Sequence, residues 1–237
     1  MSRSGGERDA EPYRGELTPL HAASALQAAR LNALDLLDTA EILYQLKRFQ
    51  HSVALSTLAI EEAGKLPILQ MIFLGFGGDR SRLWKSYRSH RAKTSMLNPG
   101  IEARVRATFP DVPPAEARKI GDLGPAPHDL ETDKQRAIYS DCLEAVDAFV
   151  CHLPRNLEWR RAAWDRLCEA QAIVHALRDY TPEELEVWSK HAAEAKARGD
   201  GFRSMLEPLH RELLEKRFIN EGQWKPILAA LEEESGT

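Results

Sequence analysis

Residues 49–74 read FQHSVALSTLAIEEAGKLPILQMIFL, and this stretch sets the fold class of the chain. Apolar residues recur along it at helical spacing, which predicts a long, largely buried helix. The glycines that follow can adopt the left-handed backbone conformation that ends a helix. Pro67 lacks a backbone N–H and predicts a bend just after Lys65. Beside that bend lies the sequence IEEAGK, residues 60–65, whose charged groups require partners if they are buried.

Helical patterns continue on both sides of this stretch. Thr18 and Pro19 supply an N-cap and a first-turn proline for a long amphipathic helix that extends to about residue 46. Asp79 is a suitable N-cap for a third helix over about residues 80–97. A fourth long helix is predicted over about residues 130–153, and further helical patterns follow to the end of the sequence.

These patterns predict an all-α fold, because no run of residues alternates between apolar and polar as a half-buried strand would. We expect a bundle of four long helices with an additional helical C-terminal lobe. The predicted division is a disordered N-terminal tail over residues 1–16, the helical bundle over residues 17–156 and a helical C-terminal extension over residues 157–237.

Composition narrows the functional classes. The 237 residues carry a net charge of −4 with both signs well mixed, which argues against a uniformly basic coat for nucleic acid but leaves room for a local basic cleft. The three cysteines leave one unpaired and have no metal-ligand spacing, so a reducing, cytoplasmic location is expected. No apolar run has the length of a membrane span or a signal peptide. No HExxH motif and no pair of Glu-x-x-His motifs of the di-iron bundle type is present, so neither a metal nor another cofactor is expected.

The charged groups of IEEAGK have two interpretations. Glu61 and Lys65 are about one helical turn apart and can form a surface ion pair worth a few tenths of a kcal/mol. Leu55 and Leu58 crowd the same face, however, and favour a buried, mutually paired arrangement. Glu62 lies on the other side of Lys65 around the helix.

His90 and Lys93 lie one turn apart on the third predicted helix. A histidine can transfer a proton near neutral pH, and a lysine can hold a phosphate and stabilise added negative charge. The alternative interpretation is a basic, solvated helix end, because arginine or lysine occupies positions 80, 82, 85, 88 and 91.

Polar residues also lie on the fourth predicted helix. Lys134 and Asp141 are seven residues apart and share one face, whereas Arg136 and Tyr139 are three apart and share another. Tyr139 can equally be a core aromatic residue whose hydroxyl is satisfied. Three helices of one bundle therefore carry polar groups that could converge on one site.

Three motifs in this order are similar to those of a known family: AIEEAGK at residues 59–65, LWKSYRSHRAK at residues 83–93 and KQRAIYSD at residues 134–141. Over about residues 20–159 the chain resembles the AbiV family of bacterial abortive-infection proteins, a branch of the HEPN superfamily. The resemblance implies a HEPN four-helix bundle, often dimeric, that acts as the toxic effector of phage defence and cleaves RNA. The HEPN signature, Arg and His separated by four to six residues, occurs only at Arg14–His21 and Arg203–His210, outside these motifs.

The resemblance also assigns the site by motif position. The candidates for catalysis are Glu61, Glu62, Lys65, His90, Lys93, Arg136, Tyr139 and Asp141, and those for RNA binding are Lys134, Arg88 and Arg91. We predict a metal-independent ribonuclease in which His90 moves the proton of a ribose 2′-hydroxyl, while Lys93, Lys65 and Arg136 bind the scissile phosphate. The glutamates orient Lys65 or His90, and Tyr139 and Asp141 support them.

The predicted partners are RNA as substrate, a phage-encoded trigger protein and a second copy of the chain, without a membrane. The alternative function is that of a non-catalytic helical binding protein in phage defence, which senses a phage protein or a nucleotide through the same polar pocket. Buried ionic networks can fix the packing of a bundle without doing chemistry.

Overall fold

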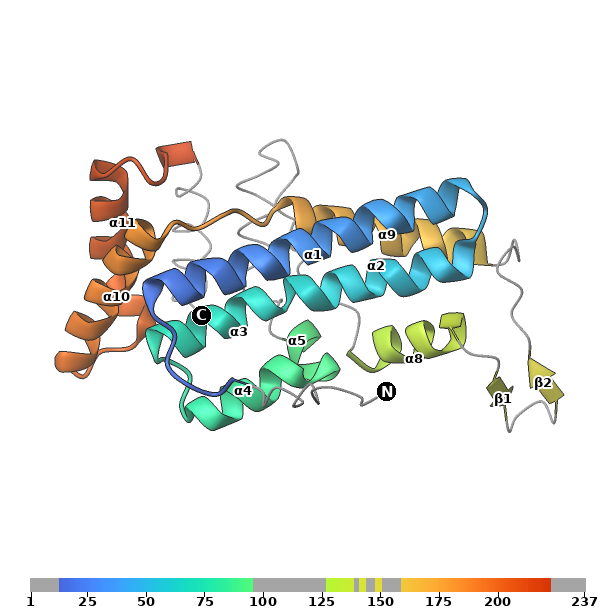
Figure 1. Cartoon of the computed structure of the whole chain (residues 1–237), viewed down its shortest axis with the longest axis horizontal. Helices are drawn as coiled ribbons and strands as arrows, with labels where there is room; N and C mark the ends of the chain where they lie inside the picture. The colour runs from blue at the N-terminus through green and yellow to red at the C-terminus, as the bar shows by residue number, and fades with distance from the viewer. Residues whose placement is uncertain (1–12, 96–126, 139–140, 144–147, 151–158, 223–237) are drawn as a thin grey trace, which may run out of the picture.

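The computed structural model of the protein describes residues 13–95, 127–138, 141–143, 148–150 and 159–222. Within these residues the chain is built almost entirely of helices, which confirms the predicted all-α fold class (Figure 1). The α-helices are α1 (Pro19–Gln45), α2 (Phe49–Ala63), α3 (Lys65–Leu74), α4 (Arg80–Arg88), α5 (His90–Ser95), α8 (Pro127–Ile138), α9 (Trp159–His175), α10 (Pro182–Ala197) and α11 (Leu206–Glu215). A short 3-10 helix, η1 (Phe202–Met205), precedes α11.

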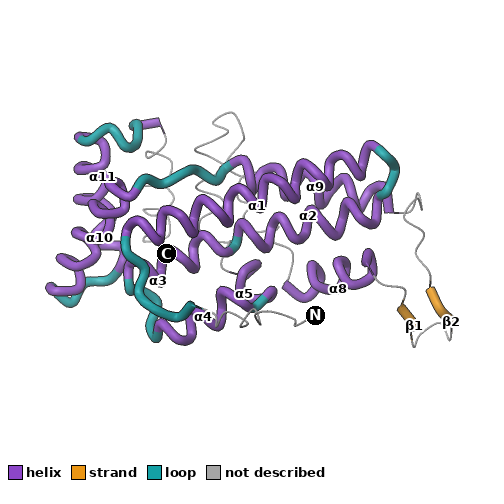
Figure 2. The backbone as a smooth tube through the Cα atoms, in the orientation of Figure 1, coloured by secondary structure: helices purple, strands orange, loops and turns teal. Residues whose placement is uncertain are grey.

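The long axis of the molecule is formed by α1 and α2, which pack closely as an antiparallel hairpin (Figure 2). After a break, α2 continues into α3. Helix α9 packs alongside α1 and α2, and α8 packs against α2. One hydrophobic core joins these helices, with Leu26, Ile60, Leu130 and Leu167 almost completely buried in it. Burial of these side chains stabilises the bundle by about 1.5–3 kcal/mol each.

Helix α9 lies within the bundle, although the sequence assigned it to the C-terminal extension that begins at residue 157. Its buried face, formed by residues such as Ala163, Leu167 and Ala170, lies against α1 and α2. Small alanine side chains allow helices to approach each other closely. The packing therefore groups α9 with the bundle rather than with α10 and α11.

The prediction that the fourth long helix extends over residues 130–153 was wrong. Helix α8 ends at Ile138, and two short strands follow, β1 (Asp141–Leu143) and β2 (Ala148–Val150), which pair antiparallel with Cys142 opposite Phe149. Apolar residues over so short a run fit a helix and a strand equally well, so their spacing could not separate the two.

Three predicted helix ends are confirmed by side-chain or backbone caps, whereas the single helix predicted over about residues 80–97 was wrong, because extended backbone at Ser89 divides it into α4 and α5. Thr18 Oγ1 accepts from the backbone N–H of His21 at 3.2 Å, and Asp79 Oδ1 accepts from that of Ser81 at 3.0 Å. Gly75 ends α3 in the left-handed conformation, at φ 65°. The bend expected after Lys65 occurs one residue earlier, at Gly64, where α2 gives way to α3.

The buried face of α1 is lined mainly by alanines. Ala22, Ala29, Ala33 and Ala40 are at most 5% exposed, and they let α2 and α9 approach α1 closely. By contrast, the larger apolar residues Leu20, Leu31, Ile42 and Leu46 are more than half exposed. The predicted helix is confirmed, and its buried face is formed mainly by its small residues.

Helices α10 and α11 form a smaller cluster against α3. Its core contains Leu74 from α3, Val187 from α10, and Met205 and Leu209 beyond it. Where the chain enters α10, the Arg178 guanidinium pairs with the buried carboxylate of Glu184. These contacts attach the C-terminal helices to the bundle.

Glu212 on α11 makes the stability of this part depend on pH. Lys190, which donates to it at 2.7 Å, lowers the pKa of Glu212 to about 2, together with Lys216 and His191. A carboxyl whose pKa is lowered by folding stabilises the fold at pH values above its pKa in the unfolded chain. This contribution is lost as the pH falls through the pKa of the folded state. We expect Glu212→Gln to lower the Tm at pH 7 by about 2–4 °C. The Tm difference from wild type should vanish as the pH approaches 2, and a difference independent of pH would contradict this assignment.

Part of the predicted disordered tail lies against α4. The Tyr13 ring packs edge-on against Trp84 with ring centroids 5.8 Å apart, and the Trp84 indole donates to the Gly15 carbonyl at 3.3 Å. Residues 1–12 of that tail lie outside the described residues. Among the helices that the structure describes, none is long and apolar enough to cross a membrane.

Candidate active site

The break at Gly64 brings α5 onto the junction of α2 and α3. A Cβ atom at Gly64 would lie 2.2 Å from the backbone oxygen of Lys93, far inside van der Waals contact. Only glycine allows this approach, although its own backbone is helical, at φ −65°. Because α5 carries His90 and Lys93, the glycine of IEEAGK is what lets these side chains lie beside the glutamates that precede it.

Glu61 is the centre of the polar cluster, with only 2% of its surface exposed. Its Oε2 atom lies 2.5 Å from Nδ1 of His90 on α5. Its Oε1 atom accepts a hydrogen bond from Nζ of Lys134 on α8, at 2.8 Å. One buried carboxylate thus joins residues from three helices, as the three motifs predicted, and its two oxygens each have a partner.

Lys134 is held between two carboxylates. Besides Glu61, its ammonium lies 2.7 Å from Oε2 of Glu131, one turn earlier on α8. Burial acts to lower the pKa of Lys134, but hydrogen bonds with Glu131 and Glu61 outweigh it and raise the pKa. The ammonium of Lys134 in turn lowers the pKa of Glu131. Lys134 is therefore a fixed positive charge. Glu131 is a cluster member that sequence reasoning missed, and its i,i+3 spacing to Lys134 was the signal for it.

Lys93 differs from Lys134 because no carboxylate of the described residues forms a salt bridge with it. Lys93 is 5% exposed, and among the residues that the structure describes it forms no salt bridge. Burial lowers its pKa, and the nearby charges of Glu61 and Glu62 only partly offset this effect. A buried ammonium without a counter-ion is unfavourable unless a ligand supplies the negative charge.

Glu62 and Lys65 form the adjacent part of the cluster. Lys65 Nζ lies 2.6 Å from Oε1 of Glu62, and Asn32 of α1 donates to Oε2 of the same carboxylate at 2.8 Å. The Lys65 ammonium also lies 5.4 Å from the ring centroid of Tyr87. Lys65 therefore pairs with Glu62 rather than with Glu61, and the interpretation of Glu61 and Lys65 as an exposed ion pair was wrong.

The sequence over residues 21–175 matches the AbiV family model. The chain belongs to the AbiV family. AbiV proteins are abortive-infection proteins of the HEPN superfamily. No curated protein and no solved structure matches the chain. The matched region contains every residue of the polar cluster, from Asn32 to Lys134, and also α9.

The polar cluster of this AbiV protein contains three groups that could act as metal ligands. Glu61, His90 and Glu131 each place one donor atom within 4.8 Å of the others. The Lys134 ammonium already lies against both carboxylates, however, and the 2.5 Å between Glu61 and His90 is a hydrogen-bond distance. A divalent cation would have to displace or approach this ammonium, so the donor set suits a proton-sharing network better than a metal.

The remaining candidates of the AbiV motifs are not part of the cluster as described. Arg136 is exposed, because two residues along a helix turn a side chain about 200° away from Lys134. Arg88 donates to the backbone oxygen of Tyr13 at 3.2 Å. Asp141 lies in β1, while Tyr139 and the side chains of Asp141 and Arg91 lie outside the described residues. The roles assigned to these residues remain predictions.

The two HEPN-type pairs lie elsewhere in this AbiV chain. Arg203 and His210 belong to η1 and α11, at the opposite end of the molecule from α8 (Figure 1). Arg14 and His21 flank the start of α1, and His21 is exposed. Neither pair includes a residue of the cluster around Glu61.

Proposed function

We propose that this AbiV protein is an abortive-infection toxin that cleaves RNA without a metal ion, and that the cluster around Glu61 is its active site. The contact between Glu61 Oε2 and His90 Nδ1 carries the proposal. A carboxylate that accepts from Nδ1 fixes the tautomer of a histidine and makes Nε2 the nitrogen that gains or loses a proton. Since 55% of the His90 side chain is exposed, substrate can reach its ring.

The proposed reaction begins at the ribose 2′-hydroxyl. Nε2 of His90 takes the hydroxyl proton, and the 2′-oxygen attacks the adjacent phosphorus. The bond from phosphorus to the 5′-oxygen breaks, and that oxygen takes a proton from Lys93. The products are a 2′,3′-cyclic phosphate and a 5′-hydroxyl, and no oxidant or cofactor is consumed. Glu61 accepts the hydrogen bond from Nδ1 and stabilises the charged imidazole.

The lysines supply the positive charge that the transition state requires. Lys93 is buried and has no salt-bridge partner in the described part of the chain, so a phosphate beside it would supply the negative charge. Lys134 is committed to Glu61 and Glu131, so its part is to hold Glu61 in place. Lys65, fixed by Glu62 next to the cluster, adds to the positive potential.

The test uses purified full-length protein, a chelator and a single-stranded RNA. We expect cleavage at the same rate with and without the chelator, and products that carry 2′,3′-cyclic phosphates. A matched oligonucleotide with 2′-deoxyribose at every position should remain intact, because the nucleophile is absent. Cleavage of the deoxy oligonucleotide, or activity that appears only with added divalent metal, would overturn the proposed chemistry.

Lys93→Met separates catalysis from stability. The methionine keeps the apolar contacts of the lysine stem but removes a buried charge without a counter-ion, so we expect the Tm to rise by a few degrees. Cleavage should fall by about 10²-fold, because the phosphate loses its nearest cation. Tm and cleavage rate would be measured on the same preparation.

Lys47→Met is the matched control, since this lysine is exposed in the turn between α1 and α2 and forms no salt bridge among the described residues. Both its Tm and its cleavage rate should stay near wild type. If Lys93→Met instead unfolds the protein at a lower temperature, the cluster serves the packing of the bundle. That outcome would favour the alternative of a non-catalytic binding protein.

A further inference from the structure

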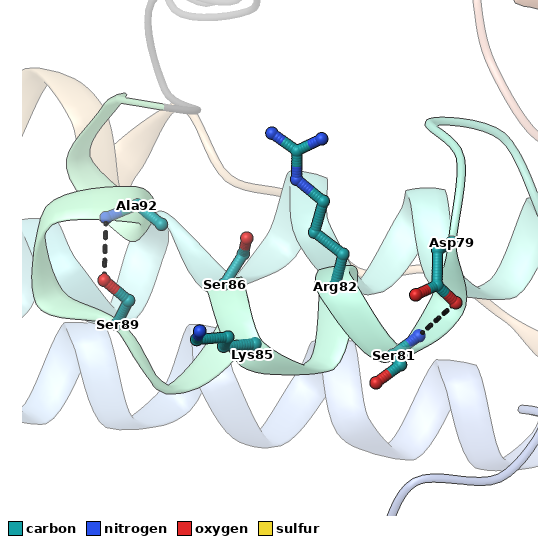
Figure 3. Close-up of a pocket in the computed structure, with 7 residues that line it drawn as sticks. All are labelled: Asp79, Ser81, Arg82, Lys85, Ser86, Ser89 and Ala92. Atoms are coloured by element: carbon teal, nitrogen blue, oxygen red, sulfur yellow. Dashed lines mark hydrogen bonds between the residues drawn. The ribbon is translucent and has the colours of Figure 1, made fainter.

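A basic hollow lies along α4, next to the proposed active site. Its volume is about 570 Å³, and its lining includes Arg82, Lys85 and the serines Ser81, Ser86 and Ser89 (Figure 3). The side chains come from successive turns of α4 and from the step into α5. Ser89 and Ala92, which line its end, stand on either side of His90 in the sequence.

We call this hollow the α4 groove. Its two cations, Arg82 and Lys85, are available to a ligand. Arg82 and Lys85 are exposed, and within the described part of the chain neither forms a salt bridge. Other basic residues of α4 are engaged: Arg80 pairs with Glu16 at 2.6 Å, and Arg88 donates to Tyr13. Positive charge therefore gathers here in a chain whose net charge is −4.

The one carboxylate of the lining, Asp79, is already used. Its Oδ1 accepts from the backbone N–H of Ser81 at 3.0 Å and caps α4 (Figure 3). Lysine, arginine and serine hydroxyls are the side chains that commonly contact phosphate oxygens of nucleic acids. A set of two cations and three hydroxyls thus fits a phosphodiester chain better than it fits an acidic peptide. The phosphates of a nucleic acid are evenly spaced along its backbone, whereas the carboxylates of an acidic peptide are not.

We propose that the α4 groove binds the phosphate backbone of a single-stranded RNA and leads it to His90. The inference rests on the proposed function and extends it by naming the substrate path. From Asp79 to Ser89 the groove spans about 15 Å, enough for several phosphates of one strand. Backbone contacts hold a strand in register without reading its sequence, so this subsite contributes affinity rather than base specificity.

Binding of a labelled single-stranded RNA to the full chain tests the proposal. The measurement is made on the His90→Ala protein, so that the RNA is not consumed, over a series of salt concentrations. The double substitution Arg82→Ala/Lys85→Ala should weaken binding by on the order of 10-fold. It should also reduce the slope of log K against log salt by about 1.4, because two phosphate contacts are lost.

A double substitution of equal charge change is the control. Arg161→Ala/Arg211→Ala removes two arginines that are 93% and 72% exposed on α9 and α11. It should leave RNA affinity near that of the His90→Ala parent. If both double variants weaken binding alike, the effect is one of net charge and the groove is not an RNA site. A polyglutamate peptide that binds through the same two cations with equal affinity would also overturn it.

Cleavage assays keep the two proposals apart. In the protein with an intact His90, the double substitution at positions 82 and 85 should raise KM for a long RNA. It should leave the turnover of a dinucleotide unchanged, because a dinucleotide is too short to reach the groove. RNA binding that depends on Arg82 and Lys85 in a protein that cleaves no RNA would support the groove and reject the proposed function. Normal cleavage with an unchanged KM in the Arg82→Ala/Lys85→Ala protein would support the proposed function and reject the groove.

Discussion

Replacing His90 by alanine is expected to lower the rate of RNA cleavage by about 10²–10⁴-fold, the usual contribution of a general acid or base. The fold should survive, because more than half of the His90 side chain is exposed and its loss leaves no cavity in the core. Glu61 keeps its hydrogen bond from Lys134 in the variant. Initial rates of cleavage and the Tm, measured on the same protein, check this expectation.

His51→Ala is the matched control for His90→Ala. His51 is an exposed histidine near the start of α2, far along the helix from Glu61, and it takes no part in the cluster. Its loss should leave cleavage unchanged. Cleavage by His90→Ala at the wild-type rate would remove this histidine from the mechanism. A Tm of the His90→Ala protein that is several degrees below that of the wild type would indicate a structural role for His90 instead.

Gly64→Ala is expected to have the largest effect on structure. The new Cβ atom would meet the Lys93 carbonyl at 2.2 Å, and a backbone group cannot rotate away as a side-chain tip can. We expect α5 to be pushed off the α2–α3 junction, at a cost of about 1–3 kcal/mol and a Tm lower by about 2–12 °C. Cleavage should fall by about 10²-fold, because a displacement of about 1 Å separates His90 from Glu61.

Gly201→Ala provides the comparison for the glycine substitution. Apart from its two chain neighbours, no residue described near Gly201 has a heavy atom within 4 Å of the added Cβ, and its φ of −83° suits any residue. Its Tm should match or slightly exceed that of wild type, since alanine reduces the freedom of the unfolded chain. Retention of full activity and Tm in Gly64→Ala would show that α5 does not need its close contact with the junction.

The helices and their ends were largely predictable because caps and periodicity are local. Thr18, Asp79 and Gly75 act as caps through groups within three or four residues of themselves, so no tertiary information was needed. The burial of α1 was less predictable. Its inner face is set by how closely α2 and α9 approach, which favours alanine, and a search for leucines places that face incorrectly.

The bundle membership of α9 and the end of α8 could not be read from periodicity. The place of α9 depends on contacts between residues far apart in the chain, because it belongs to the bundle through α1 and α2. The strands β1 and β2 are three residues each, too short for a period of two to stand out from a helical pattern.

The sequence predicted several of the residues that form the site, but it predicted less well which of them pair with each other. The three motifs placed Glu61, His90 and Lys134 on separate helices, and the structure brings them within hydrogen-bond distance. The expected partner of Glu61 on its own helix was Lys65, but His90 and Lys134 from other helices occupy both oxygens of Glu61. Lys65 pairs with Glu62 instead.

The central claim is that this AbiV protein acts on cells by cutting RNA at the site formed by Glu61, His90 and Lys93. The most direct measurement sequences the RNA ends that carry 2′,3′-cyclic phosphate in bacteria after induced expression of the wild-type and His90→Ala proteins. We predict new cyclic-phosphate ends with the wild type and none above background with His90→Ala, at equal protein levels. Growth arrest by the wild-type protein without new ends, or the same ends with both proteins, would contradict it.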